Sequence, residues 1–168
     1  TAPASRAHSC AAVSRVGRAR TAPRDDALLP SARIAFASCQ QWEHAWFHAY
    51  RGMIAQDPRL ILFLGDYIYE RRSGAPPFVR DFGAPEPTDL PGYRARHALS
   101  KSDADLQAAH AACAWIVAWD DHEVANDYVG LTPPDPGLDA AFGLRRAAAY
   151  QAYFEHMPLR PSALLRNG

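Results

Sequence analysis

The sequence is short of lysine, cysteine, net charge and long hydrophobic runs, and these shortages bear on several classes of protein. Lys101 is the single lysine, and 18 basic residues balance 18 acidic ones to a formal net charge of zero. A balanced charge gives no basic footprint of the kind that nucleic-acid-binding proteins carry. No apolar run approaches the roughly 20 residues that a membrane-spanning helix needs. No stretch has the charged and then apolar layout of a signal peptide.

The three cysteines neither establish a disulfide framework nor identify the redox compartment of the protein. Cys10, Cys39 and Cys113 are an odd number at scattered positions, which is poor evidence for a disulfide framework. The redox compartment therefore stays open. The length of 168 residues suits one domain or part of a larger one. Residues 1–32 lack clear periodicity, and we interpret them as a tail or the end of a preceding domain, with a packed domain over 33–168.

Three apolar runs that end in possible metal ligands are the most informative part of the chain. They are Ile34–Cys39, Leu60–Tyr69 and Trp115–Glu123. Such runs are typical of buried parallel strands, and ligands gather past the carboxyl ends of parallel strands. One sheet edge would then carry a thiol, a carboxylate with a phenol, and two carboxylates with an imidazole. This donor set points to a metal site and to metal-assisted hydrolysis.

The segments between these runs predict helices and loops. Apolar residues from Trp42 to Ile54 recur at helical spacing, and Asp57, which precedes a proline, should stop that helix. The order strand, helix, strand indicates a right-handed parallel crossover, and hence an α/β fold with a largely parallel sheet and flanking helices. The dense Gly, Pro, Arg and Asp of residues 71–92 predict a long loop, which is usually functional or disordered.

Two further helices are predicted towards the C-terminal end. Ser102 and Asp105 resemble a capping box, followed by a helix over residues 103–113. The last helix should run from about residue 139 to residue 157, and Pro158 should end it.

The ligand segments also have simpler interpretations. Asp66 after Gly65 could cap a turn, and Cys39 could fill space in the core. The run Asp120–Glu123 could be a solvated helix N-terminus, which favours acidic residues, although His122 fits poorly there. Four consecutive ionisable residues directly after a buried strand are costly unless they are paired or bind metal. Taken together, the three segments therefore favour the metal site.

Three motifs at the predicted strand ends carry a resemblance to a known family. They are Phe36-Ala37-Ser38-Cys39-Gln40, then Gly65-Asp66-Tyr67-Ile68-Tyr69-Glu70, then Trp119-Asp120-Asp121-His122-Glu123-Val124 with Asn126-Asp127-Tyr128. Together they resemble the PhoD family of alkaline phosphatases, which are phosphodiesterase-type members of the wider metallophosphatase superfamily. The likeness covers roughly residues 15–160. It implies a four-layer α/β/β/α sandwich of which this chain would hold half, with residues 1–32 matching, at best, the end of a leading β-sandwich.

The resemblance implies a ligand set for ferric iron and calcium. Cys39 and Tyr69 would bind Fe³⁺, and Asp66 would bridge the two metals. Asp121 would bind Ca²⁺, which takes carboxylate oxygens, and Asp120 would be a further ligand. These assignments come from the family and not from spacing alone.

The resemblance also implies the reaction, which is hydrolysis of phosphodiesters or phosphomonoesters by a metal-activated hydroxide. His122 would contact the phosphoryl or leaving-group oxygen of the phosphoester substrate. Relatives are typically exported, and further ligands would lie beyond Gly168, so we expect an incomplete domain that is inactive alone. One alternative is a non-catalytic truncated remnant that folds weakly or associates through an exposed half-core. A nucleotide-binding module is less favoured because no glycine-rich phosphate cradle follows the first strand.

Overall fold

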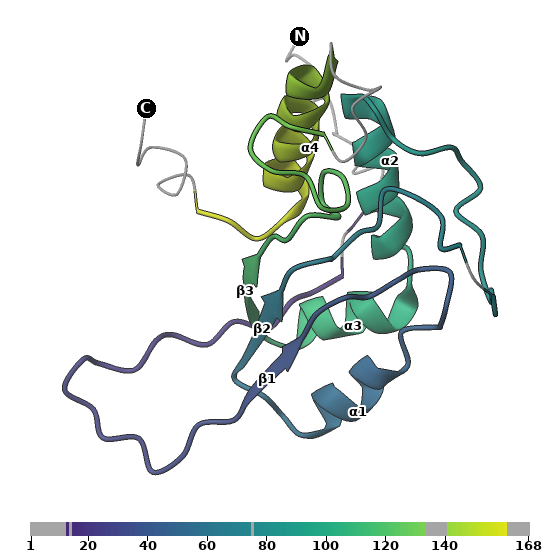
Figure 1. Ribbon diagram of the computed structural model, residues 1–168. Coiled ribbons are helices and arrows are strands. Elements are labelled where there is room, and N and C mark those ends of the chain that lie inside the picture. Colours follow the sequence, from purple (N-terminus) through teal and green to yellow (C-terminus); the bar gives the residue numbers. More distant parts are fainter. Residues whose placement is uncertain (1–12, 14, 75, 134–140, 161–168) are drawn as a thin grey trace, which may run out of the picture.

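The core of the chain is a parallel three-stranded sheet (Figure 1). The computed structural model describes residues 13, 15–74, 76–133 and 141–160. The strands are β1 (Ile34–Ala37), β2 (Leu60–Leu64) and β3 (Ala114–Ala118), in the spatial order β1-β2-β3. The predicted α/β class and parallel sheet are therefore confirmed. The register pairs Ile34 with Leu60 and Leu60 with Ala114, so the carboxyl ends of the strands lie at one edge.

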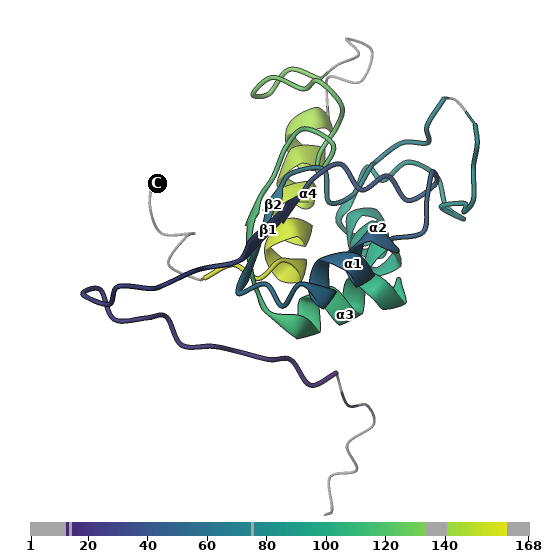
Figure 2. The same ribbon diagram turned by 90° about the horizontal axis from the view of Figure 1, so that it is seen from below.

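Four helices accompany the sheet within the described residues. They are α1 (Ala49–Ala55), α2 (Leu90–Lys101), α3 (Ala104–Ala112) and α4 (Phe142–His156). Helix α1 packs on α3, and α2 packs on α4. Figure 2 shows all four on the same side of the strands. Among the described residues, no helix has the length and apolar character needed to cross a membrane.

The two faces of the sheet differ in burial because side chains alternate along a strand. Phe63 and Trp115 point to the helices and are buried. On the other face Phe36 is 73% exposed and Ile116 is 59% exposed, with Ile34 and Leu64 beside them also exposed. This outer face is apolar and is left uncovered by the described residues. It is consistent with one half of a layered sandwich.

The first helix is shorter than its apolar spacing predicts, because Arg80 takes the backbone groups that a longer helix would use. The Arg80 Nε donates to the Trp42 carbonyl at 3.0 Å, and an Nη donates to the Ala45 carbonyl at 2.5 Å. The guanidinium also lies 3.6 Å from the centre of the Trp42 ring. Residues 42–44 therefore form a turn, and the helix begins only at Ala49.

The loop predicted over residues 71–92 is wrong at its end, because α2 begins at Leu90. Asp89 caps this helix by accepting a hydrogen bond from the Gly92 N–H at 2.8 Å, and a proline in the first turn suits a helix start. The buried face of α2 carries Tyr93, Arg96, His97 and Ser100. Three of these four side chains are strongly polar, so no apolar periodicity marks the helix in the sequence.

The remaining helix boundaries need smaller corrections. Asp103, not Ser102, caps α3, because its carboxylate accepts from the N–H groups of Asp105 and Leu106 at 2.9 and 3.1 Å. Ser102 instead donates to the Leu99 carbonyl at the end of α2. Helix α3 ends at Ala112, and α4 ends at His156, each one residue before the predicted end. The predicted start of the last helix, at residue 139, lies outside the described residues.

The predicted division of the chain at residue 33 stays a prediction. Described residues between 15 and 33 contain no helix or strand. The Arg18 N–H donates to the Ala111 carbonyl at 2.8 Å, so this segment contacts the end of α3. Residues 1–12 of the expected tail lie outside the described part.

We expect the double substitution Phe36→Ser and Ile116→Ser to lower the binding of a fluorescent hydrophobic-surface dye to the chain. Both side chains lie on the exposed outer face, so the free energy of unfolding should change by less than roughly 1 kcal/mol. Leu144→Ser is the control, since Leu144 is 77% exposed but lies on α4. Dye fluorescence that falls no further in the double variant than in the control would contradict the exposed sheet face.

Candidate metal centre

Two of the predicted ligands sit at strand ends in an uncommon backbone conformation. Cys39, two residues after β1, has a φ of 56°, and Asp66, two residues after β2, has a φ of 58°. A non-glycine residue in this left-handed region costs roughly 1–3 kcal/mol and persists only when its surroundings fix it. The Cys39 N–H donates to the Gly65 carbonyl and the Gln40 N–H to the Asp66 carbonyl, both at 3.1 Å. The ladder thus continues past the strands and holds both turns in place.

Gly65 allows the ends of β2 and β3 to touch. Its φ is +107°, and a Cβ on this residue would lie 2.6 Å from the Asp120 Cβ and 2.9 Å from the Asp120 nitrogen. No side chain fits in that space. The close approach therefore sets Asp66 on one segment against Asp121 on the other.

Glu123 joins the same two segments through its carboxylate. It accepts backbone hydrogen bonds from Asp66 at 3.1 Å, from Asp120 at 2.7 Å, and from Tyr67. Burial raises the pKa of Glu123 to about 7, although the three N–H donors act in the opposite direction. The sequence marks Glu123 only as one of four consecutive ionisable residues, so this structural role was not predicted.

A cluster of three possible ligands lies at this edge of the sheet. One ligand atom from each of Asp66, Asp121 and His122 lies within 4.8 Å of the others. The Tyr69 hydroxyl donates to the Asp66 Oδ2 at 3.1 Å. The Asp66 Oδ1 is buried and has no hydrogen-bond partner among the described residues. An unpaired buried carboxylate oxygen is costly, and a bound cation would satisfy it.

His122 is held by the Glu70 carboxylate, for which the sequence motif alone indicated no role. Its Nδ1 lies 2.7 Å from the Glu70 Oε2, and the Glu70 Oε1 accepts from the Asn126 N–H at 2.9 Å. Burial lowers the pKa of His122, but the hydrogen bond and charge of Glu70 outweigh it, and the net pKa lies above the usual value. Burial likewise raises the pKa of Glu70, yet its partners bring it below the usual value. Glu70 thus leaves Nε2 as the free ring nitrogen.

The other predicted ligands are Tyr69, Cys39 and Asp120, and they differ in how closely they approach this cluster. The Tyr69 ring centre lies 4.1 Å from that of His122. Burial, followed by the nearby Asp66 and Cys39, raises the pKa of the Tyr69 phenol above its usual value. Cys39 is exposed and lines a cavity beside the cluster, although it is not one of the three clustered residues. Asp120 accepts from the Asp121 N–H at 3.0 Å, within its own turn. The metal roles of all these residues stay predictions.

A cavity of about 640 Å³ opens beside the cluster. Its lining residues are Cys39, Gln41, His44, Tyr69, Arg71, Arg72, Ser73, Gly74, His122 and Asn126. Three predicted site residues thus share one cavity with two arginines. Sequence spacing did not indicate the arginines, because they lie in the segment predicted as a loop.

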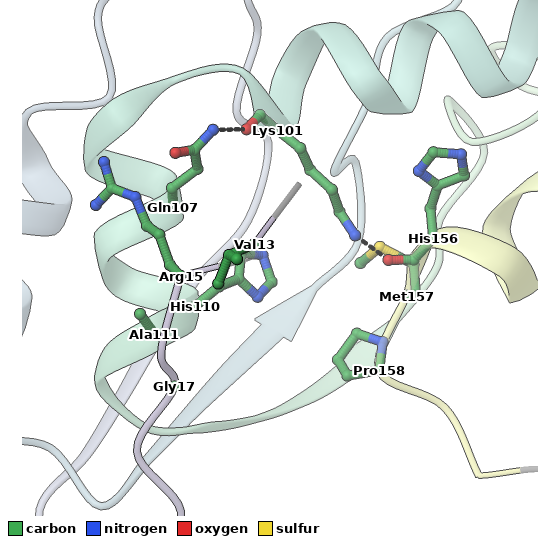
Figure 3. A pocket seen from close by; sticks show the side chains of 10 residues that line it. All are labelled: Val13, Arg15, Gly17, Lys101, Gln107, His110, Ala111, His156, Met157 and Pro158. Atoms are coloured by element: carbon green, nitrogen blue, oxygen red, sulfur yellow. Dashed lines mark hydrogen bonds between the residues drawn. The ribbon is translucent and has the colours of Figure 1, made fainter. Parts of the chain in front are cut away.

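A second cavity of about 640 Å³ lies among the ends of α2, α3 and α4 and contains none of the strand-end residues (Figure 3). In it the Lys101 Nζ donates to the His156 carbonyl, and the Gln107 Nε2 donates to the Lys101 carbonyl at 2.8 Å. These contacts tie helix ends together. No carboxylate is among the described residues that line it, so it is not the candidate metal centre.

Comparisons with known proteins agree with this geometry. A family model described as PhoD-like phosphatase matches residues 34–167. Alkaline phosphatase D of Bacillus subtilis (strain 168) is 48% identical over 159 residues, which are 90% of this chain and 27% of that protein. A solved structure of PhoD matches with a TM-score of 0.83 and 49% identity, over 90% of this chain and 30% of that chain. The chain thus spans less than a third of the length of either relative.

We expect Gly65→Ala to lower the free energy of unfolding by roughly 2–5 kcal/mol, through left-handed strain and overpacking against Asp120. Gly52→Ala is the matched control, because Gly52 lies in α1 with no atom within 4 Å of an added Cβ. That change should raise stability by up to about 1 kcal/mol, the helix preference for alanine. Urea unfolding of both variants gives the comparison, and similar stabilities would contradict the close approach.

Proposed function

Because the chain belongs to the PhoD-like phosphatase family, we propose that its strand-end cluster is part of a metal-dependent phosphoester hydrolase site. One observation carries the proposal. The Asp66 Oδ1 is buried without a hydrogen-bond partner among the described residues, in a cluster with Asp121 and His122. Oxygen and nitrogen donors gathered around an unsatisfied carboxylate are what a bound cation requires.

The donor set fits the two metals that the family resemblance implies. We propose that the Cys39 thiolate and the Tyr69 phenolate bind Fe³⁺, because both are anionic donors suited to a ferric ion. Asp121 would offer carboxylate oxygen to Ca²⁺, which prefers oxygen ligands. Asp66 would bridge, because its two oxygens can face two ions. Asp120 is the weaker candidate, since its carboxylate already bonds its own turn.

In the proposed hydrolysis, the metals and His122 have different roles. Two cations held by this set would polarise a phosphate and make an attacking water more acidic. The chain supplies His122, whose Nδ1 is occupied by Glu70 and whose ring lines the cavity. A proton on Nε2 could be donated to the phosphoryl or leaving-group oxygen as negative charge develops there. Glu70 would fix both the tautomer and the direction of the ring.

The alternative of a non-catalytic, self-associating piece is favoured by a different observation, the uncovered apolar outer face of the sheet.

We expect the 168-residue chain alone to show no multiple turnover. A calcium ion takes about six to eight oxygen ligands, more than the cluster of Asp66, Asp121 and His122 provides. Metal-dependent turnover by the isolated chain would contradict this expectation.

Ferric iron added to the 168-residue chain should produce a visible absorption band, because phenolate and thiolate donate charge to Fe³⁺. Tyr69→Phe should shift or bleach the band, and Asp66→Asn should weaken iron binding. Tyr150→Phe is the control, because the Tyr150 hydroxyl contacts the Tyr128 hydroxyl at 3.0 Å and not the cluster. An unchanged spectrum in Tyr69→Phe would remove Tyr69 from the ligand set.

Turnover can be tested in a chimera in which this chain replaces the matching region of the Bacillus subtilis relative. His122→Ala should lower the turnover of an activated phosphodiester by roughly 10²- to 10⁴-fold, the range of general acid catalysis. Glu70→Gln should cost roughly 10- to 100-fold, as expected for a residue that orients another. His156→Ala, at the far end of α4, is the control. Metal analysis of the same samples decides the role, since metal lost in proportion to activity would make His122 a ligand.

A further inference from the structure

The outer part of the cavity beside the cluster is rich in positive charge. Its lining residues include Arg71 and Arg72, and no carboxylate is among the described residues that line it. Both arginines follow directly after Glu70, whose side chain is buried and held by His122 and Asn126. The backbone that presents the two arginines is therefore fixed next to the metal-binding segment.

The charge of Arg72 is already balanced. An Nη of Arg72 lies 2.6 Å from the Asp81 Oδ1. Asp81 also accepts a hydrogen bond from the Gly83 N–H at 2.5 Å. Arg72 is thus tied to the segment that follows, and a ligand would have to compete with Asp81 for its guanidinium.

Arg71, unlike Arg72, has no carboxylate within hydrogen-bonding distance among the described residues. Within the described part of the chain, its one recorded contact with a carboxylate joins its Nε to the Glu70 Oε1 at 3.9 Å. That oxygen is already bonded to the Asn126 N–H, and the other oxygen of Glu70 is bonded to His122. The Arg71 side chain is 53% exposed. It therefore offers a guanidinium to the cavity with its hydrogen-bonding capacity largely unused.

We propose that Arg71 is a specificity-determining residue that binds an anionic group of the substrate other than the phosphate at the metal cluster. The inference rests on the proposed function, which places the scissile phosphate at Asp66, Asp121 and His122. A guanidinium binds carboxylate and phosphate oxygens with two parallel hydrogen bonds. The site then selects phosphoesters that carry a second negative charge near the scissile phosphate. Esters with neutral substituents lack this contact.

The competing role for Arg71 is a contact with the scissile phosphate itself. The two roles differ in what a second anionic group contributes. If Arg71 binds the scissile phosphate, a ligand with one phosphonate engages it fully. If Arg71 binds a separate group, a ligand with two anionic groups engages it better than a ligand with one.

The test uses the 168-residue chain with Fe³⁺ and Ca²⁺ present and two matched ligands, propylphosphonate and 3-phosphonopropionate, which differ by a terminal carboxylate. Phenylglyoxal modification of each arginine is followed by mass spectrometry. We expect 3-phosphonopropionate to slow modification of Arg71 several-fold more than propylphosphonate does, with Arg72 and Arg59 little changed. Arg59 is an internal control, because it is exposed and precedes β2 at the opposite end of the strand from Asp66.

Two arginine variants test the same assignment by ligand binding. Arg71→Gln should weaken binding of 3-phosphonopropionate by roughly tenfold or more, the effect of losing one charge-assisted hydrogen bond. Arg72→Gln should change it by less than about twofold, because a ligand at Arg72 would have to displace Asp81. Equal protection of Arg71 by both ligands, equal protection of Arg59, or no protection would each overturn the proposal.

The same samples separate this proposal from the proposed function. Selective protection of Arg71 in a chain that gains no iron absorption band would leave the anion site standing without the metal site. An iron band that responds to Asp66→Asn, without selective protection of Arg71, would support the metal site and overturn the role of Arg71.

Discussion

One buried carboxylate holds the functional edge of this sheet together. Glu123 accepts backbone hydrogen bonds from Asp66, Tyr67 and Asp120, which lie on the segments that leave β2 and β3. Without that carboxylate the buried N–H groups of Asp66 and Tyr67 would lack a partner, at a cost of roughly 1–3 kcal/mol each. The positions of Asp66 and Asp121, and so the distances within the cluster, depend on this bridge. The glycine at residue 65 makes the approach possible, and Glu123 makes it stable.

A buried ion pair shapes the segment between β1 and α1. Arg80 pairs with Asp103 at 2.7 Å, and both side chains are almost fully buried. The same guanidinium holds the carbonyls of Trp42 and Ala45. Breaking one partner of a buried pair is strongly destabilising because the other charge is left uncompensated. A residue in the long loop after β2 thus fixes the course of the chain just beyond Cys39.

The features that follow from local pattern could be predicted from the sequence, and those that depend on distant partners could not. The strands are short apolar runs, and the candidate ligands follow them directly, so their meeting at one edge was predictable. Helix α2 was missed because its buried face is polar. Glu70 and Glu123 were missed because their partners lie more than 50 residues away, at His122 and at Asp66. The roles of the arginines depend on the cavity, which spacing alone does not show.

The left-handed backbone at Asp66 bears on how such a site can change in evolution. Glycine, asparagine and aspartate adopt this conformation most readily, so few other residues can replace Asp66 without straining the turn. The replacements that preserve the turn best, asparagine and glycine, are also those that remove the negative charge. A descendant could therefore lose the charge and keep the shape through one substitution. Inactive relatives of this protein should be recognisable by an intact turn that carries a neutral residue.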